Sequence, residues 1–313
     1  MTEPDLEEDI AVPLGIDLRA SFIMQRVGRN DPTARLEESR FVKAARTAEG
    51  PVTVEITMAS GGRHARVRAW GEGAAYAMAR AAAWLGDDDG LASFAPPPGL
   101  VATIHKDHRT LRLPRSPFPH EVHAAFILQQ RVTWAEAAGQ YGRLARDYGE
   151  DAPGPHALRL FPDRKVLAGL PRHVYLGMGI DSKRGGALVE AMRLAFRVDA
   201  LASRDEARAY LSKIPGTGPW TTENVLASGF GDPDAVSPGD VNLPHMVCFA
   251  LAGDEHGSDE RMFELLEPYR GHRNRAVRLL FLGGPTRPYI DRGLNRSIAH
   301  RPGRPSSPAK RSR

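Results

Sequence analysis

The stretch LSKIPGTGPWTTENV, residues 211–225, is the starting point for interpreting the second half of the chain. A predicted amphipathic helix ends at Lys213, and a second helix begins directly after Gly216 and Gly218, which flank Thr217. A turn this tight needs glycine where the backbone takes positive φ, and free amides then point outward at the N-terminus of the second helix. Such amides suit a DNA phosphate, although an ordinary helix–turn–helix corner would use the same residues.

A carboxylate follows Trp220 by 20 residues, in the segment SPGD at 237–240 that opens another predicted helix. A purely structural interpretation is a capping box, with Ser237 as the N-cap and Asp240 three residues on. The helix dipole also keeps a carboxylate in the first turn ionised, and an ionised carboxylate stabilises a developing oxocarbenium ion on a sugar. Asp240 is therefore a candidate for both roles.

At these residues the chain resembles the helix-hairpin-helix DNA glycosylases of base-excision repair, most of all the bacterial 3-methyladenine DNA glycosylase II group. In that superfamily a hairpin of the form (L/I/F)-P-G-x-G precedes the base pocket, and an aspartate follows about twenty residues later. Residues 214–218 and Asp240 match this pattern. Members with lyase activity carry a lysine two residues after the second hairpin glycine. Trp220 stands there in this chain, so the resemblance implies a monofunctional enzyme without lyase activity.

Other segments of the chain also resemble this family and support the comparison. Residues 125–133 and 141–149 resemble the family's long helix and the "LYG" end that follows it, and residues 176–184 resemble its "LG…K(R/A)" helix entry. The region before Pro117 is similar to the TATA-binding-protein-like domain that the same group carries at its N-terminus.

The chain divides into two regions of different pattern, as its length of 313 residues suggests. Residues 16–116 are predicted to form an α+β domain with an antiparallel sheet. Alternating residues at 52–58 and 64–70 surround a glycine turn, an alanine-rich helix covers 74–85, and another strand is expected over 100–113.

Residues 117–300 are predicted to form an all-helical domain. Apolar residues recur there at helical spacing between glycine, proline and aspartate breaks. The expected helices cover residues 121–148, 182–196, 205–213, 219–229, 238–251, 258–269 and 272–282.

Both ends of the chain are expected to be disordered. Residues 1–15 form an acidic leader, and residues 301–313 form a tail with five basic residues and no acid. The net charge of the whole chain is +4, so the remainder carries −1, and the positive excess lies in the tail. The tail is expected to act at most as a weak phosphate tether, so DNA binding is predicted from the hairpin and not from the overall charge.

Composition excludes several classes of protein. The single cysteine, Cys248, can supply neither an internal disulfide nor the ligands of an iron–sulfur cluster or a cysteine-rich zinc site. Apolar runs are too short to span a bilayer, and the acidic N-terminus is unlike a secretory signal. We expect a monomeric, cytoplasmic and nucleoid-associated protein that acts on double-stranded DNA containing damaged bases.

No cofactor or metal is expected, apart from a monovalent cation on the hairpin carbonyls, which the resemblance allows. Histidines at 105, 108, 120 and 123 have a spacing that could hold a metal. However, they fall on a predicted strand and a proline-rich loop and not on one helix face.

The resemblance assigns Asp240 as the catalytic residue, which stabilises the transition state and orients or deprotonates the attacking water. A base must be flipped out of the duplex and held by aromatic faces before this chemistry. A ring face favours a cationic alkylated purine by about 0.5 to 2 kcal/mol. The expected pocket residues are Trp220, Trp134, Gln130, Asn224, His272 and Phe22.

Asn224 and His272 fall where the closest relatives carry aromatic residues, so an oxidised or deaminated base remains an alternative substrate. A non-catalytic DNA-binding module is a further alternative, although such a module has no need of Asp240. Arg131 is expected either to fill the gap left by the flipped base or to be an ordinary surface residue. The expected DNA contacts are Ile214, Gly216, Thr217, Gly218, Arg131, Lys183, Arg184, Arg273 and Arg275.

Overall fold

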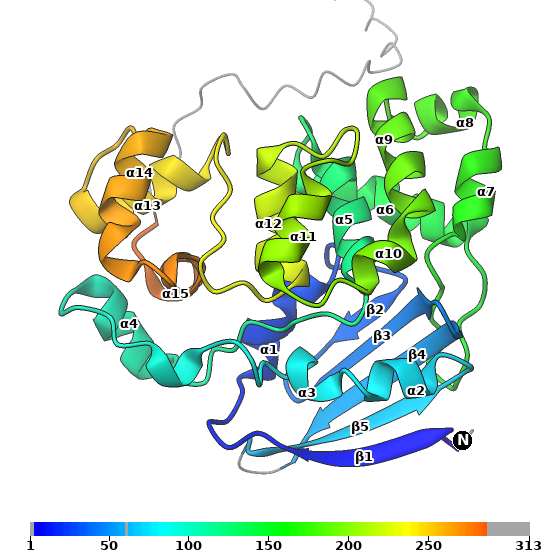
Figure 1. Ribbon diagram of the computed structural model, residues 1–313, viewed down its shortest axis with the longest axis horizontal. Coiled ribbons are helices and arrows are strands. Elements are labelled where there is room, and N and C mark those ends of the chain that lie inside the picture. The colour runs from blue at the N-terminus through cyan, green and yellow to red at the C-terminus, as the bar shows by residue number, and fades with distance from the viewer. Residues whose placement is uncertain (1–2, 60–61, 287–313) are drawn as a thin grey trace, which may run out of the picture.

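The computed structural model describes residues 3–59 and 62–286. All strands within these ranges belong to one five-stranded antiparallel sheet with the order β1-β5-β4-β3-β2. Helices follow along the rest of the chain and lie on one side of this sheet (Figure 1). The strands are β1 (Leu6–Ala11), β2 (Ala34–Leu36), β3 (Arg40–Thr47), β4 (Gly50–Met58) and β5 (His64–Trp70).

The predicted hairpin is present as β4 and β5, although Ser60 and Gly61 of its turn lie outside the described residues. Five successive residues of β4 are buried because both faces of the sheet are covered. Phe41, Val54 and neighbouring residues pack under the short helices α2 (Ala74–Met78) and α3 (Ala81–Trp84), which replace the single helix predicted there. The opposite face packs against a loop around Leu160.

The acidic leader was predicted to be disordered, which is wrong for residues 6–11. These residues form the edge strand β1 because their acids lie opposite basic residues of β5. Arg66 donates to Asp9 at 2.9 Å, and Arg68 donates to Glu7 at 2.9 Å. Cross-strand pairs of opposite charge stabilise such an edge.

The strand predicted over 100–113 is also wrong, since residues 100–107 form helix α4 (Leu100–Asp107). Val101 and Ile104, three residues apart, are buried against α15 (Arg273–Gly283). Figure 1 shows α4 beside α15, away from the sheet. The end of the predicted sheet domain therefore packs with the C-terminal helices.

The helix predicted over 121–148 is divided into α5 (Pro119–Gln129) and α6 (Trp134–Tyr148). Arg131 lies in the break with φ of +62°, one of two non-glycine residues with positive φ among the described residues. Thr133 then caps α6 by accepting from the Glu136 amide.

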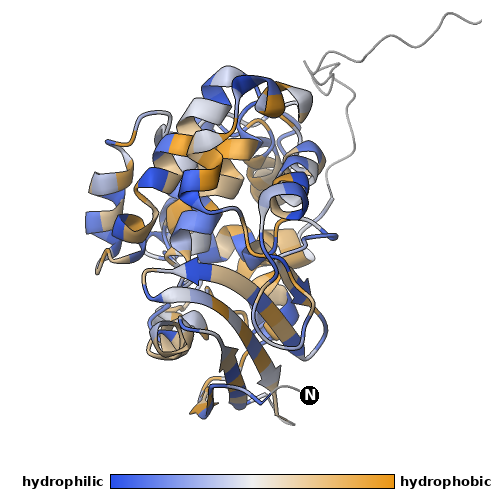
Figure 2. Cartoon of the chain, turned by 90° about the vertical axis from the view of Figure 1, so that its right-hand side faces the viewer, coloured by the Kyte–Doolittle hydropathy of each residue, from blue (hydrophilic) through white to orange (hydrophobic). Residues whose placement is uncertain are grey.

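The remaining helices separate into a central group around α5 and a C-terminal group around α13. Figure 2 shows the alternation of polar and apolar residues along them. None of the helices in the described ranges combines the length and apolar character needed to cross a membrane. Helix α1 (Leu18–Phe22) packs in the core of the sheet. The helices of the two groups not yet given are α7 (Arg164–Gly169), α8 (Arg172–Gly177), α9 (Ser182–Arg193), α10 (Ala195–Asp199), α11 (Arg204–Leu211), α12 (Pro219–Gly229), α13 (Leu243–Ala252) and α14 (Asp259–Leu266). The basic tail, 301–313, lies outside the described residues.

Candidate functional site

The hairpin between α11 and α12 is a type II turn that the local sequence explains. Pro215 sets φ at the second position, and Gly216 takes φ of +82° at the third. The Thr217 amide then donates to the Ile214 carbonyl at 2.9 Å and closes the turn. Ile214 is buried in the core around α12 and anchors the turn.

The two hairpin glycines have different surroundings. A Cβ on Gly216 would overlap with Ala187 of α9, so this glycine is required by both its φ and its packing. Gly218 was expected to share the positive φ, which is wrong, because it has φ of −85° and serves as the N-cap of α12. A Cβ there would meet nothing within 4 Å. No side chain caps α12, so the amides of its first turn point out beside an open glycine.

Asp240 lies beside Trp220, which agrees with the prediction from the sequence that both residues belong to one site. Its Oδ2 accepts from the Trp220 indole Nε1 at 2.8 Å. Its Oδ1 accepts from the amides of Asn242 and Leu243, at 2.8 and 2.9 Å. The predicted capping box led by Ser237 is wrong, because α13 begins at Leu243 and its N-cap is Asn242. Asp240 lies two residues before this N-cap, in the segment that leads into the helix. Both carboxylate oxygens are thereby fixed in orientation.

Trp220 is half-buried at the start of α12. Its ring packs on Phe126 in a T-shaped arrangement, with 5.8 Å between centroids and 78° between planes. Asn224, one turn later, donates its Nδ2 to the Trp220 carbonyl at 2.8 Å, which turns the amide back onto its own helix. The indole is thus held on one side by α5 and oriented by Asp240 on another.

Gln130 contacts the hairpin directly. Its Nε2 donates to the Gly216 carbonyl at 2.8 Å and to Thr221 Oγ1 at 2.9 Å. Arg131 follows it and is exposed, at the break between α5 and α6. Trp134 lies beyond this break, at the first position of α6, and is 36% exposed.

Phe22 does not line the site, contrary to the prediction. It is fully buried under the sheet, between Phe41 at 4.8 Å and Trp84 at 5.7 Å between ring centroids. Its apolar neighbours in α1 belong to the same core, so its ring is not accessible to a flipped base.

Arg184 is not available to bind DNA. It is buried, pairs with Asp181, and donates to the Leu128 carbonyl and to Gln140 Oε1 at 2.7 and 2.9 Å. Its guanidinium therefore joins α9 to α5 and α6. The preceding residue, Lys183, is exposed in the first turn of α9.

The two arginines predicted as DNA contacts in α15 are structural as well. Arg275 is 0% exposed and bonds the carbonyls of Leu111 and Asp89 at 2.8 and 2.6 Å. Arg273 forms a bidentate pair with Asp234. Their helix faces the protein interior at these positions, a property that a cluster of basic residues in sequence does not reveal.

His272 lies at the N-cap of α15, where its Nε2 is 3.2 Å from Ser93 Oγ. Its ring stacks obliquely on Phe94, and burial lowers its pKa. Phe94 also meets His105 at 5.0 Å. No group of three or more metal-ligating side chains is found within the described ranges, so the four histidines considered above do not converge.

His123 was not predicted to belong to the site. It is fully buried in α5, and its Nε2 is hydrogen-bonded to Thr217 Oγ1 at 2.7 Å. Burial lowers the pKa of His123 to about 3, so the ring is neutral at physiological pH. The only signal in the sequence that connects His123 with Gln130 is their separation of seven residues, which is two helical turns.

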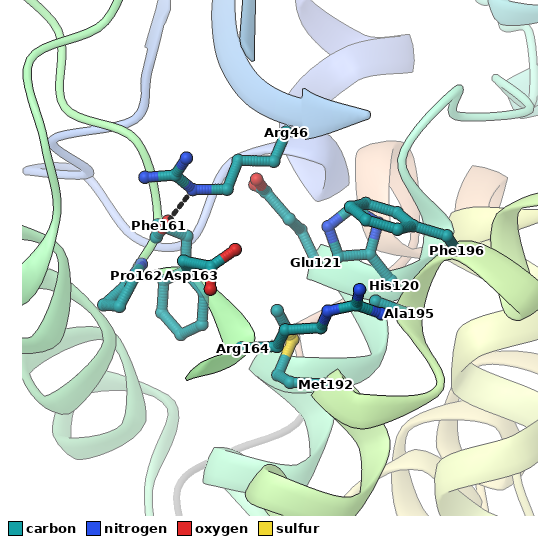
Figure 3. A pocket seen from close by; sticks show the side chains of 10 residues that line it. All are labelled: Arg46, His120, Glu121, Phe161, Pro162, Asp163, Arg164, Met192, Ala195 and Phe196. Atoms are coloured by element: carbon teal, nitrogen blue, oxygen red, sulfur yellow. Dashed lines mark hydrogen bonds between the residues drawn. The ribbon is translucent and has the colours of Figure 1, made fainter. Parts of the chain in front are cut away.

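A small cleft lined by apolar and charged side chains lies at the other end of α5 (Figure 3). Arg46 of β3 points into it beside Glu121 and His120, and its Nε donates to the Phe161 carbonyl at 3.2 Å. Glu121 is buried and pairs with Lys43 at 2.5 Å. None of the predicted site residues lines this cleft, which joins the sheet to the helices.

Solved structures of two DNA glycosylases have folds similar to that of this chain. A 3-methyladenine DNA-glycosylase from Archaeoglobus fulgidus superposes with a TM-score of 0.67 at 15% identity, over 88% of this chain and 97% of that one. An 8-oxoguanine glycosylase/lyase from Clostridium acetobutylicum gives 0.61 at 15% identity, over 90% and 99%. At these identities the likeness concerns the fold alone.

A curated relative gives a shorter match in sequence. A "probable bifunctional transcriptional activator/DNA repair enzyme AlkA" from Mycobacterium tuberculosis is 30% identical over 135 residues, which is 42% of this chain and 27% of the relative. The chain thus spans just over a quarter of that relative's length. No protein-family model matches. The resemblance to helix-hairpin-helix DNA glycosylases, predicted from the hairpin and Asp240, is confirmed.

Proposed function

We propose that this chain, whose fold is that of helix-hairpin-helix DNA glycosylases, is a monofunctional DNA glycosylase that flips out and hydrolytically excises alkylated bases of the 3-methyladenine type. The observation that carries the proposal is the Asp240 carboxylate, oriented by Trp220 Nε1 at 2.8 Å and by two backbone amides. These donors hold the negative charge beside an aromatic ring, which is the arrangement that a cationic base and an oxocarbenium-like sugar require.

The reaction follows from these groups. An alkylated purine is cationic and leaves readily once the glycosidic bond lengthens, so little acid catalysis is needed. Asp240 stabilises the positive charge that develops on the sugar and orients the attacking water. The Trp220 ring, which packs against Phe126, supports the flipped base.

The absence of lyase activity is inferred from Trp220. A lyase forms a Schiff base between an amine and the sugar, and an indole nitrogen, which here donates to Asp240, cannot supply that amine. The released product is therefore expected to be the free base, and the DNA strand is expected to remain intact.

The DNA contacts proposed are those of the hairpin and of the break after α5. The open Gly218 and the uncapped first turn of α12 suit a phosphate, and Lys183 is exposed on α9. Arg131 is exposed with φ of +62°, a strained conformation of the kind that is retained at functional positions, and we assign it to the gap left by the flipped base.

An oxidised or deaminated base is the second candidate substrate, because solved structures with this fold include an 8-oxoguanine glycosylase/lyase. Asn224 would be the residue that reads such a base. One N–H of its Nδ2 is bound to the Trp220 carbonyl, which leaves the second N–H and the carbonyl oxygen to do so.

Mass spectrometry of bases freed from alkylated, oxidised and deaminated duplex DNA tests the proposal. We expect 3-methyladenine and related alkylated bases, without strand cleavage on a denaturing gel. Asp240→Asn should reduce release by at least about 10²-fold while DNA binding persists. Release of no base by protein that binds methylated duplex normally would overturn the proposal, and release of oxidised bases alone would favour the second candidate.

A further inference from the structure

Two polar side chains, one in α5 and one at its C-cap, hold the hairpin from one side. His123 and Gln130 lie seven residues apart, so they face the same direction two turns apart. His123 Nε2 binds Thr217 Oγ1 at 2.7 Å, and Gln130 Nε2 donates to the Gly216 carbonyl at 2.8 Å. The third and fourth residues of the turn, Gly216 and Thr217, are therefore each held by one hydrogen bond from this side.

The hairpin is confined from a second direction as well. Ala187 of α9 packs so closely on Gly216 that no side chain fits there, and Thr217 is only 6% exposed. The Thr217 hydroxyl thus points toward His123 and away from solvent. Pro215, Gly216 and Gly218 remain exposed, and a Cβ at Gly218 would meet nothing within 4 Å.

We propose that His123 and Gln130 are positioning residues that hold the hairpin in its DNA-binding conformation before DNA arrives; this inference rests on the proposed function. Binding then requires no ordering of the turn, and the entropy of ordering a loop on binding is avoided. Burial lowers the pKa of His123 to about 3, so its ring stays neutral across the physiological pH range. The clamp that His123 and Gln130 form on the hairpin therefore stays intact across that range.

Three variants test the clamp. Thr217→Val removes the hydroxyl and keeps the shape of the side chain, His123→Ala removes the ring, and the double variant combines them. Loss of one hydrogen bond should raise the Kd for a fluorescein-labelled duplex with a tetrahydrofuran abasic analogue by about three- to tenfold. The double variant should be no weaker than His123→Ala, because both changes break the same bond.

The same variants should change the free protein. Hydrogen exchange at the Gly216, Thr217 and Gly218 amides should quicken by about three- to tenfold in His123→Ala. His123→Gln should restore slow exchange and affinity, since its amide reaches where Nε2 lay. Turnover of His123→Ala and His123→Gln under saturating DNA should stay within about twofold of the wild type, because Asp240 is untouched.

His120→Ala is the matched control, because it removes another buried imidazole of α5, one bound to Asp199 at 2.6 Å and not to the hairpin. It should lower the melting temperature without changing hairpin exchange or Kd. The inference is overturned if His123→Ala leaves hairpin exchange unchanged, or changes it without changing Kd. A wild type that releases no base and binds no DNA would overturn the proposed function, while exchange would still decide whether the clamp exists.

Discussion

Among single residues, Asp240 shows how neighbouring donors define a side chain's chemistry. Two amides at the start of α13 hold Oδ1, and the Trp220 indole holds Oδ2. The carboxylate therefore has one well-defined orientation before substrate binds. Most of the rate enhancement from electrostatic catalysis comes from groups that are preorganised in this way.

Trp220→Phe separates the two roles of the tryptophan, since phenylalanine keeps a ring face and loses the indole donor. We expect turnover to fall by about tenfold, the value of one charge-assisted hydrogen bond, with a smaller change in KM. Steady-state kinetics on methylated duplex measures both. In an Asp240→Asn background the same substitution should change turnover little, and an undiminished effect there would show that the ring acts by stacking alone.

His123 gives a pH dependence with a definite sign. Burial lowers its pKa in the folded protein from 6.5 to about 3. Below pH 6.5 the His123 imidazole is therefore protonated in the unfolded chain but stays neutral in the folded protein. The free energy of unfolding consequently falls as pH drops from 6.5 toward 3. The loss is about 1.4 kcal/mol per pH unit. Urea unfolding at pH 7.5 and 5.5 should show a smaller loss for His123→Gln than for the wild type, and equal losses would contradict this assignment.

At the scale of elements, the hairpin uses its two glycines for different purposes. Gly216→Ala should destabilise the fold by about 1–3 kcal/mol, because φ is positive and Ala187 occupies the space. Gly218→Ala should leave stability within about 0.5 kcal/mol and weaken DNA binding, because its Cβ would block a phosphate. Denaturant unfolding and fluorescence anisotropy compare them. Equal losses of stability in both variants would refute this division of roles.

The break between α5 and α6 stores strain at Arg131. Arg131→Gly relieves the positive φ and should raise the free energy of unfolding by about 1 kcal/mol, while base release falls because the side chain is lost. Ala157 has φ of +49° and provides the control. Ala157→Gly should stabilise similarly and leave base release unchanged. Full activity of Arg131→Gly would show that this residue is an ordinary surface arginine.

At the scale of the whole molecule, Asp89 connects segments far apart in the chain. Its buried carboxylate pairs with Arg112 at 3.0 Å and Arg275 at 3.2 Å, and it accepts from the Leu113 amide. These contacts fasten α15, at the end of the described chain, to the loop after α3. The C-terminal helix α15 and the segment that follows the sheet are thus part of one packed structure.

Asp89→Asn should destabilise the protein by about 3–5 kcal/mol, since it leaves two buried guanidinium groups without a counter-charge. Glu37→Gln, which breaks an exposed pair with Arg40, is the matched control and should cost less than about 1 kcal/mol. Denaturant midpoints compare the two. A small effect of Asp89→Asn would mean that water or rearranged backbone carbonyls stabilise the two guanidinium groups in place of the lost carboxylate charge.

Local features were predictable from the sequence because short-range sterics determine them. Pro215 and Gly216 specify the turn, and alternating residues specify β4 and β5. The strand predicted over 100–113 was wrong, since the apolar spacing of α4 has meaning only against α15. Short apolar runs are ambiguous until their partner is known.

The sequence by itself determined the turn, the candidate aspartate and the resemblance that connects them. Only the tertiary structure decided which side chains can reach DNA: Phe22, Arg184 and Arg275 are buried, and His123 lies against the hairpin. The reason is physical. Turn geometry depends on neighbours in the chain, whereas burial and hydrogen-bond partners depend on residues brought together by packing from distant positions.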